Sequence, residues 1–388
     1  MEPLSHIRVL DLTRARSGPT CIRQLSEMGA QVVKVEMPGE EDDSVGGRYG
    51  SDFQNLHPNK RSITVDMKTE AGKEVIFRLA RVSDVLVENF RPRVKHRLGI
   101  DYETIKKINP RLVYTSISGF GQEGPYKDHA GLDQIAQGLS GFMTVNGFPE
   151  HGPLRAGLPI ADLTAGFMAA YGTVVALLER ERSGEGQWVH TSLLQGMMRL
   201  MDLQAARWLQ GGEIPPQAGN YHPVGTPTGV YKCKDGSIII QAAGGRLYTR
   251  LLEVIEAPAL ATDPRFATAE ARLKHREEMT QELEKRLVTQ DRAYWQKRFH
   301  EAGVPAGPIL DTKQAFENEQ VKELPAWRPA KSEKLGKLKL TGHGVNLSRT
   351  PPSIRSAAPE RGEHTDEILK ELEYSAAEIA SLHETGAV

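Results

Sequence analysis

The stretch that decides the fold is residues 7–36, IRVLDLTRARSGPTCIRQLSEMGAQVVKVE. Residues 7–12 form an apolar run typical of a buried strand, residues 19–28 have helical character, and residues 31–36 form a second apolar run. This succession predicts a β-α-β unit. Because short apolar runs and helical segments go on alternating up to residue 117, we predict an α/β fold with a mostly parallel sheet covered by helices.

The second of these strands ends on Glu36, where a dinucleotide-binding fold has its ribose-binding acid. The turn after the first strand argues against that function. Residues 13–19 hold one glycine, Gly18, whereas the G-x-G-x-x-G fingerprint needs three for close approach to a pyrophosphate. The sequence therefore disfavours a nicotinamide cofactor.

The composition is that of an ordinary soluble globular protein, with 39% hydrophobic and 26% charged residues. At 388 residues the chain exceeds the size at which one core keeps growing, so we expect two domains. Lys and Arg total 49 against 50 Asp and Glu. With no net basic field to hold nucleic acid, any anion site has to be local.

The two cysteines, Cys21 and Cys233, lie far apart in the sequence, which excludes a disulfide scaffold and fits a reducing compartment. A lowered pKa at the start of a helix is conceivable for Cys21, but a buried, inert thiol is the expected role. We see no signal peptide, and the apolar run of residues 166–178 is too short to span a bilayer, so we expect a cytoplasmic protein. The histidine spacing supports no metal site.

A Gly- and Pro-rich segment, residues 211–227, marks the domain boundary. We predict a large domain over residues 1–210 and a small domain over residues 225–320, which begins with a β-hairpin that turns at Lys234–Gly236. Residues 321–388 are predicted to form an extended return path and further helices.

Basic and aromatic residues gather where the predicted strands end. In parallel sheets ligands bind beyond the carboxyl ends of the strands. Guanidinium groups suit phosphate and aromatic rings suit a base. Each residue alone is interpreted as part of a solvated rim, but as a group they indicate a site for a phosphorylated, partly aromatic molecule. The group is Arg14, Arg16, Lys60, Arg61, Lys68, Asn89, Phe90, Arg91, Arg93 and Arg97.

A lone carboxylate, Asp162, stands at the start of a long apolar helix predicted in residues 157–182. Two interpretations stay open on the residues alone. Asp162 is either an N-cap, whose side chain accepts a backbone N–H, or a nucleophile or general base in the positive field of a helix N-terminus. Asp133, which opens another helical segment, is interpreted as a cap. A hydrolase elbow of the form G-x-S-x-G is absent.

Several motifs, in the right order along nearly the whole chain, resemble the class III coenzyme A transferases. That resemblance implies a two-domain subunit with a Rossmann-like larger domain built from both chain ends, a smaller α+β domain, and two subunits interlocked in a homodimer. It also implies acyl-CoA and small carboxylic acids as substrates, without a permanently bound cofactor, nucleic acid or membrane. The motifs are residues 9–13, 18–19, 29–36, 59–62, 87–90, 184–187 and 362–365.

Carried over residue by residue, the resemblance makes Asp162 the catalytic aspartate. Residues 222–225 replace a run of glycines found in formyl transferases, so His222 and Gly225 are expected near the substrate, and Arg48 is a candidate partner for a second carboxylate of the acceptor. The chain departs from formyl transferases at Met37 and Ala130, where they have basic residues. The residues expected to contact coenzyme A are Arg16, Ser17, Val65, Lys68, Asn89, Phe90, Arg91 and Arg97, with Lys68 and Arg97 as phosphate partners.

The expected reaction is transfer of coenzyme A from an acyl-CoA, such as succinyl-CoA, to a free carboxylic acid through an aspartyl anhydride and an aspartyl-CoA thioester. Backbone N–H groups near Gly225 or at the start of the Asp162 helix are expected to stabilise oxyanions. The same helix end is expected to keep the carboxylate ionised.

Two alternatives remain open. Proton transfer of the α-methylacyl-CoA racemase type would use a histidine beside Asp133, but Leu132 stands there. A non-catalytic acyl-CoA-binding protein would need Asp162 only as a cap.

Overall fold

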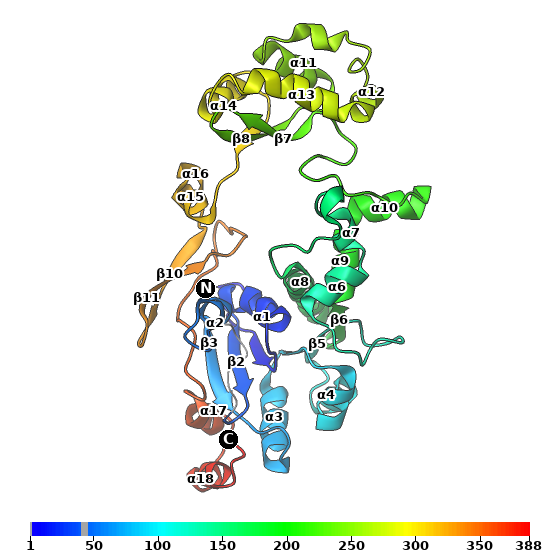
Figure 1. Ribbon diagram of the computed structural model, residues 1–388. Helices are drawn as coiled ribbons and strands as arrows, with labels where there is room; N and C mark the ends of the chain where they lie inside the picture. The colour runs from blue at the N-terminus through cyan, green and yellow to red at the C-terminus, as the bar shows by residue number, and fades with distance from the viewer. Residues whose placement is uncertain (1, 40–45) are drawn as a thin grey trace. The chain divides into compact units, whose positions relative to one another are not determined.

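The computed structural model describes residues 2–39 and 46–388 (Figure 1). The chain divides into two compact units. Unit 1 comprises Met1–Phe142, Ala156–Ala205 and Glu323–Val388, and unit 2 comprises Met143–Arg155 and Ala206–Lys322. The predicted boundaries differ from this division at residues 143–155 and 206–210, which lie in unit 2. Residues 143–155 do so because the amide of Gln217 donates to the carbonyls of Asn146 and Gly152, at 2.6 and 2.7 Å.

A six-stranded sheet in the order β3-β2-β1-β4-β5-β6 forms the centre of unit 1, and every neighbouring pair in it is parallel. The predicted α/β class with a parallel, Rossmann-like sheet is therefore confirmed. The strand order reverses between β1 and β4, which is where sheets of this kind bind ligands. The strands are β1 (Arg8–Asp11), β2 (Gln31–Glu36), β3 (Lys60–Thr64), β4 (Val85–Glu88), β5 (Val113–Ser118) and β6 (Trp188–Ser192).

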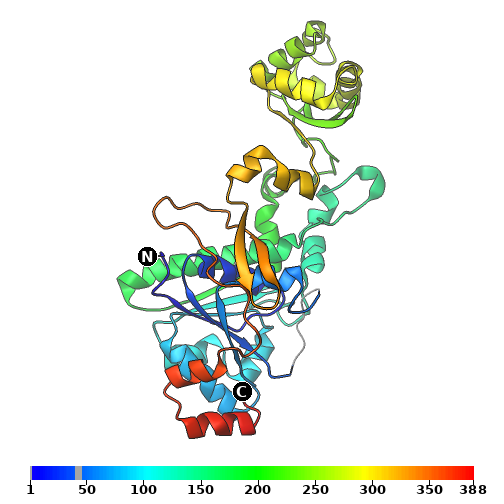
Figure 2. The ribbon, with the colours of Figure 1, turned by 90° about the vertical axis from the view of Figure 1, so that its left-hand side faces the viewer.

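Helices cover both faces of the sheet, because successive strand residues point to opposite sides. In β1, Val9 packs with α1 (Ser17–Glu27), α8 (Ile160–Ser183) and α9 (Leu193–Leu200). Leu10 packs on the other face, with α3 (Glu70–Val82), α5 (Tyr102–Ile108), α17 (Thr365–Glu371) and α18 (Ala376–Glu384). Figure 2 shows the last two helices, in red, on that side. The remaining helices of this part of the chain are α2 (Ser51–Leu56), α4 (Pro92–Leu98) and α6 (Asp133–Leu139), and α7 (Phe142–Val145) begins at the boundary with unit 2.

The long helix α8 lies close against α1 because small residues form its contact face. A Cβ atom at Gly166 would lie 2.7 Å from the carbonyl oxygen of Ser17, so only glycine permits this approach. By length and composition α8 is the one helix in the described residues that could cross a membrane, although half of its apolar window is buried within the protein. The uninterrupted apolar run of residues 166–178 is only part of this helix, which has 24 residues.

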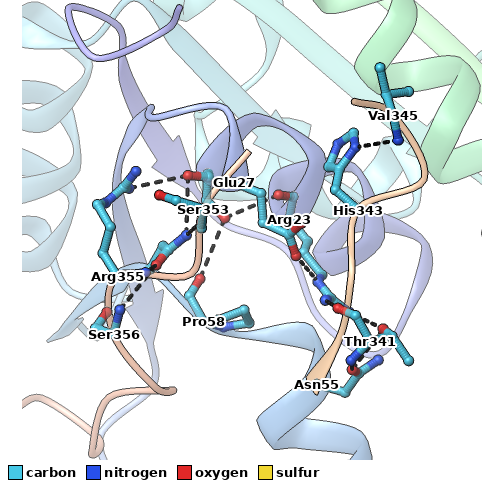
Figure 3. Close-up of polar contacts among 12 residues, drawn as sticks. Arg23, Glu27, Asn55, Pro58, Thr341, His343, Val345, Ser353, Arg355 and Ser356 are labelled. Carbon is cyan, nitrogen blue, oxygen red and sulfur yellow. Dashed lines mark hydrogen bonds and ion pairs between the residues drawn. The ribbon is translucent and has the colours of Figure 1, made fainter. Parts of the chain in front are cut away.

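The chain returns to unit 1 through a hairpin that the sequence analysis missed, formed by β10 (Trp327–Ser332) and β11 (Gly336–Thr341). The following segment runs along α1 and is tied to it by polar contacts (Figure 3). The buried guanidinium of Arg23 donates to Glu27 and to both the hydroxyl and the carbonyl of Thr341. Farther on, the backbone N–H of Arg355 donates to Asn59 at 2.6 Å.

Unit 2 has a three-stranded antiparallel sheet in the order β7-β8-β9, packed against helices, which is the α+β arrangement predicted. The hairpin β7–β8 turns where predicted. In this part of the chain, α12 and α13 are separated at His275, and α9 ends just before Asp202, whose φ is 33°. The elements are β7 (Thr228–Cys233), β8 (Gly236–Gln241), β9 (Ala306–Pro308), α10 (Asp202–Gly211), α11 (Gly245–Val254), α12 (Ala269–Lys274), α13 (Arg276–Leu287), α14 (Arg292–Glu301), α15 (Thr312–Glu317), α16 (Glu319–Glu323) and the short turns η1 (Pro149–His151) and η2 (Pro258–Ala261).

Candidate active site

Asp162 lies in the first turn of α8, at its third residue, and not at its N-cap. The helix begins at Ile160, and Pro159 occupies the N-cap position without a side-chain hydrogen bond. The interpretation of Asp162 as the N-cap is therefore wrong, since its side chain is one turn too far along to cap this helix. The carboxylate is left for another role.

The cap of α8 comes instead from Asp133 on α6. Its Oδ1 accepts the backbone N–H groups of Ala161 and Asp162, at 2.8 and 3.2 Å, and its Oδ2 accepts the side-chain amide of Gln137 at 2.6 Å. The prediction that Asp133 caps the helix it opens is wrong, because its carboxylate caps α8, which is distant in sequence. Its own helix has Leu132 at the N-cap position.

The loop between β1 and α1 places two further predicted residues beside this carboxylate. Ser17 is the first residue of α1, and its hydroxyl and backbone N–H both hydrogen-bond to Asp162. Arg16, at the N-cap position of α1, interacts electrostatically with Asp162 and forms an ion pair with Asp52 of α2. Asp162, Ser17 and Arg16 therefore come together in unit 1.

Burial and the negative charge of Asp133 raise the pKa of Asp162 to about 6, whereas Arg16 and Ser17 act in the opposite direction. The pKa is raised because desolvation and the neighbouring carboxylate outweigh the opposing effects of Arg16 and Ser17. With a pKa of about 6, the group is still roughly 90% ionised at pH 7.

The comparison with known families decides what kind of protein this is. The profile described as CoA-transferase family III matches residues 4–365. The chain belongs to CoA-transferase family III. It is an enzyme of the transferase class, and coenzyme A thioesters are the substrates of that class.

Two curated relatives illustrate the likeness of this CoA-transferase to enzymes of known activity. Acetyl-CoA:oxalate CoA-transferase of Acetobacter aceti is 36% identical over 95% of this chain and 96% of its own length. Succinate–glutarate CoA-transferase of Agrobacterium fabrum is 35% identical over 96% of this chain and 96% of its own length. Among solved structures, a CAIB/BAIF family protein from Brucella suis superposes with a TM-score of 0.83 at 33% identity, over 96% of this chain and 99% of that one.

The residues predicted to contact coenzyme A follow three strands of the transferase, β1 and β4 at the switch point and β3 at the edge of the sheet. The amide of Asn89, just after β4, binds the backbone of Arg14, just after β1. Phe90 is half-buried against the core, and Arg91 is the exposed N-cap residue of α4. The side chains of Lys68 and Arg97 are exposed, whereas Val65 is fully buried and offers no side-chain surface.

Arg48 has a structural role in place of the expected contact with an acceptor carboxylate. It is buried, forms an ion pair with Glu36, and donates to the carbonyl of Pro359 at 2.6 Å. The second carboxylate oxygen of Glu36 accepts the hydroxyl of Ser62. Glu36 is therefore engaged inside the protein, which removes it as a ribose-binding acid.

His222 and Gly225 lie in unit 2, in the loop before β7. The Nδ1 atom of His222 accepts the backbone N–H of Val224 at 3.3 Å, which leaves Nε2 of the exposed ring as the outward atom. A Cβ atom at Gly225 would lie 3.2 Å from that Nδ1. Their contact with substrate stays a prediction.

A buried charged cluster beneath the β1–α1 loop escaped the sequence analysis, which placed Lys60 on the solvated rim. The Nζ atom of Lys60 lies 2.9 Å from Asp11 and 3.0 Å from His57, and burial lowers its pKa to about 8. Burial raises the pKa of the neighbouring Cys21 far above its ordinary value, so this thiol is inert, as expected. In residues 2–39 and 46–388, no cluster of three or more potential metal ligands occurs.

Proposed function

We propose that this CoA-transferase moves coenzyme A from a short dicarboxylyl-CoA, such as succinyl-CoA, to a free carboxylic acid, with Asp162 as the nucleophile. The observation that carries the proposal is a largely buried carboxylate with a pKa of about 6, hydrogen-bonded to Ser17 at the switch-point side of the sheet. The dicarboxylate class rests on relatives named for succinate, glutarate and D-citramalate. The free, buried cysteines favour a reducing, cytoplasmic setting.

The reaction needs four balanced steps and no net proton transfer. A carboxylate oxygen of Asp162 attacks the donor thioester carbon, the C–S bond breaks, and coenzyme A leaves as a thiolate. The thiolate attacks the aspartyl carbonyl and expels the donor acid, which leaves an aspartyl-CoA thioester. The acceptor carboxylate then displaces the thiolate to form a second anhydride, and attack of the thiolate on the acceptor's acyl carbon regenerates Asp162. This sequence requires no resident cofactor.

The start of α8 does not supply the oxyanion donors. Its first four N–H groups are all engaged: that of Ile160 by Leu158, those of Ala161 and Asp162 by Asp133, and that of Leu163 by Pro159. We assign oxyanion stabilisation to donors outside this helix, namely the hydroxyl and backbone N–H of Ser17, which hydrogen-bond to the same Asp162 carboxyl group that the thiolate attacks.

The racemase alternative loses its second base. Asp133 lies near Asp162, but both of its oxygens accept N–H groups, so it is committed to holding α8. The adjacent Leu132 has an exposed, apolar side chain. A proton transfer on both faces of a carbon needs two available bases, and the described residues around Asp162 provide one.

We further propose that the transferase is a homodimer in which a second copy covers the outer face of α8. Phe167, Tyr171 and Leu178 are 49%, 71% and 69% exposed and recur at helical spacing on that face. A cavity of about 640 Å³ beside it is lined by α1, α8 and residues 341–345.

The nucleophile is tested by trapping the aspartyl intermediate. The transferase is incubated with succinyl-CoA and hydroxylamine, digested, and the peptide containing Asp162 is weighed. A hydroxamate on Asp162, absent in Asp162→Asn and present in the exposed-site control Asp202→Asn, supports the proposal. An unmodified peptide together with turnover by Asp162→Ala would refute it. Solvent deuterium at the α-carbon of recovered acyl-CoA would instead identify a racemase.

A further inference from the structure

We infer that Asp133, oriented by Gln137, is a positioning residue that fixes the first turn of α8 and thereby aims the carboxylate of Asp162. The inference rests on the proposed role of Asp162 as nucleophile. It concerns a residue that would touch no substrate and act through the helix it caps.

The geometry of α6 and α8 carries this inference. One carboxylate oxygen of Asp133 accepts two successive N–H groups of α8, and the second of these belongs to the nucleophile itself. The other oxygen accepts from Gln137, whose side chain is fully buried. The Oε1 atom of Gln137 in turn accepts the backbone N–H of Ala156, at 2.9 Å, in the segment that leads into α8. Gln137 therefore holds both the capping residue and the chain that enters the helix.

The helix needs such a cap from outside. Pro159, at its N-cap position, offers no side-chain acceptor. The nucleophile is the third helical residue, so fraying of one turn would move its carboxylate directly. A displacement of about 1 Å at a reacting group can cost on the order of 100-fold in rate. The cap is therefore expected to matter more for the rate than for the global stability.

The charge of Asp133 adds a second effect. Of the charged groups around Asp162, Asp133 raises its pKa and Arg16 lowers it. Elsewhere on the helices packed against α8, Arg23 pairs with Glu27 on α1, and Arg199 of α9 pairs with Asp202. A more basic carboxylate is the stronger nucleophile once ionised, so Asp133 both aims Asp162 and strengthens it.

Exchange of the two partners tests the geometry. Asp133→Ala is expected to lower kcat about 100-fold while the KM for acyl-CoA changes less than about threefold. The double variant Asp133→Asn/Gln137→Glu keeps an acceptor for α8 and restores the bond between the two side chains with donor and acceptor exchanged. Its kcat is therefore expected to be at least tenfold higher than that of Asp133→Ala. Gln134→Ala, exposed on the same helix, serves as the control.

The charge effect is tested by the pH profile. In Asp133→Asn alone, the acid limb of kcat/KM is expected to move to lower pH by about half a unit or more, because a negative charge beside the nucleophile is lost. Substitution of a purely structural residue would neither lower kcat at an unchanged KM nor shift the acid limb. Turnover of Asp133→Ala like wild type, or an unmoved limb in Asp133→Asn, overturns the inference. The failure of the proposed function has a different sign, because hydroxylamine would then leave Asp162 unlabelled in the wild type. If the wild type is labelled and only the Asp133 variants behave like wild type, the inference alone fails.

Discussion

The side-chain amide of Asn89 binds both backbone polar groups of Arg14: Oδ1 accepts the N–H at 2.9 Å, and Nδ2 donates to the carbonyl at 2.8 Å. This double contact joins the end of β4 to the loop after β1, across the point where the strand order reverses. It holds the loop that carries Arg16 and Ser17. We therefore expect Asn89 to shape the site for coenzyme A chiefly through this loop.

Asn89→Asp keeps the shape of the side chain but sets a carboxylate against the carbonyl of Arg14. The lost donor and the repulsion are expected to cost roughly 1–3 kcal/mol locally, which corresponds to an increase of roughly 5- to 150-fold in the KM for acyl-CoA. Steady-state kinetics measure this, with the exposed Asn220→Asp as the control. A KM unchanged from wild type would contradict the role of Asn89 in holding the loop.

Lys68→Ala and Arg97→Ala are each expected to raise the KM for acyl-CoA several-fold with little change in kcat, because exposed cations contribute to phosphate binding but not to the chemical step. The measurement compares succinyl-CoA with its 3′-dephospho analogue. At least one of the two variants should raise the KM for the analogue less than the KM for succinyl-CoA. Lys107→Ala, which removes an exposed cation on α5, should change the KM for neither substrate. Equal losses on both substrates would place the two residues away from the 3′-phosphate.

The acid limb of kcat/KM is expected at the pKa of Asp162, about 6. Because only the ionised carboxylate is a nucleophile, the rate should fall about tenfold per pH unit well below that value and level off above pH 7. The limb is read from initial rates at subsaturating acyl-CoA between pH 4.5 and 8, after residual activity has confirmed that the protein survives the acid. A rate that is flat down to pH 5 would mean that another group limits the reaction.

Asp162→Asn is expected to stabilise the folded transferase at pH 7. The pKa of Asp162 is raised in the folded protein from 3.8 to about 6, so the folded state binds this proton more tightly and loses stability as pH rises through that window. Removal of the charge should recover on the order of 1–2 kcal/mol at pH 7. Urea unfolding at pH 7 and pH 4 measures the difference in free energy of unfolding between the variant and the wild type, and this difference should be smaller at pH 4. An equal gain at both values would point to packing instead of charge.

Tyr171→Arg and Leu178→Arg are expected to convert a dimer into monomers, because each places a charge on the exposed apolar face of α8. Light scattering coupled to size-exclusion chromatography reports the mass in solution. Val82→Arg, on an exposed apolar residue of α3, is the matched control and should leave the mass unchanged. A wild-type monomer, or a dimer that persists in both α8 variants, would exclude this face as the interface.

Most of the fold was predictable because apolar periodicity reports burial directly. The strand over residues 31–36 was located to the residue. Strand β3 begins at Lys60, ahead of its apolar residues, and its Lys60 and Ser62 are buried polar residues that bind Asp11 and Glu36. A pattern of hydrophobicity does not reveal partners that are distant in sequence, so these two residues looked like part of a loop.

The candidate site was predictable in part for the same reason. Asp162 stood out as a lone carboxylate in an apolar segment, and the family motifs located Ser17 beside β1. The cap of α8 was not predictable, since the donors on α8 and the acceptor Asp133 are almost thirty residues apart in sequence and meet only in the fold. The role of Arg48 was not predictable, because the sequence does not show whether a guanidinium faces the carboxylate of a ligand or, as here, the buried carboxylate of Glu36.

The core of unit 1 includes Ile368, Leu382 and Val388, and the backbone N–H of Asp66 donates to the carbonyl of Ala387. During synthesis, the sheet strands leave the ribosome long before these residues do, whereas all of unit 2 is already complete at Lys322. Unit 2 is therefore complete on the nascent chain before the last helices of unit 1 are made, and the part of the sheet face that α17 and α18 cover stays open until they have left the ribosome. We expect the nascent chain to be most prone to aggregation through this apolar face until then.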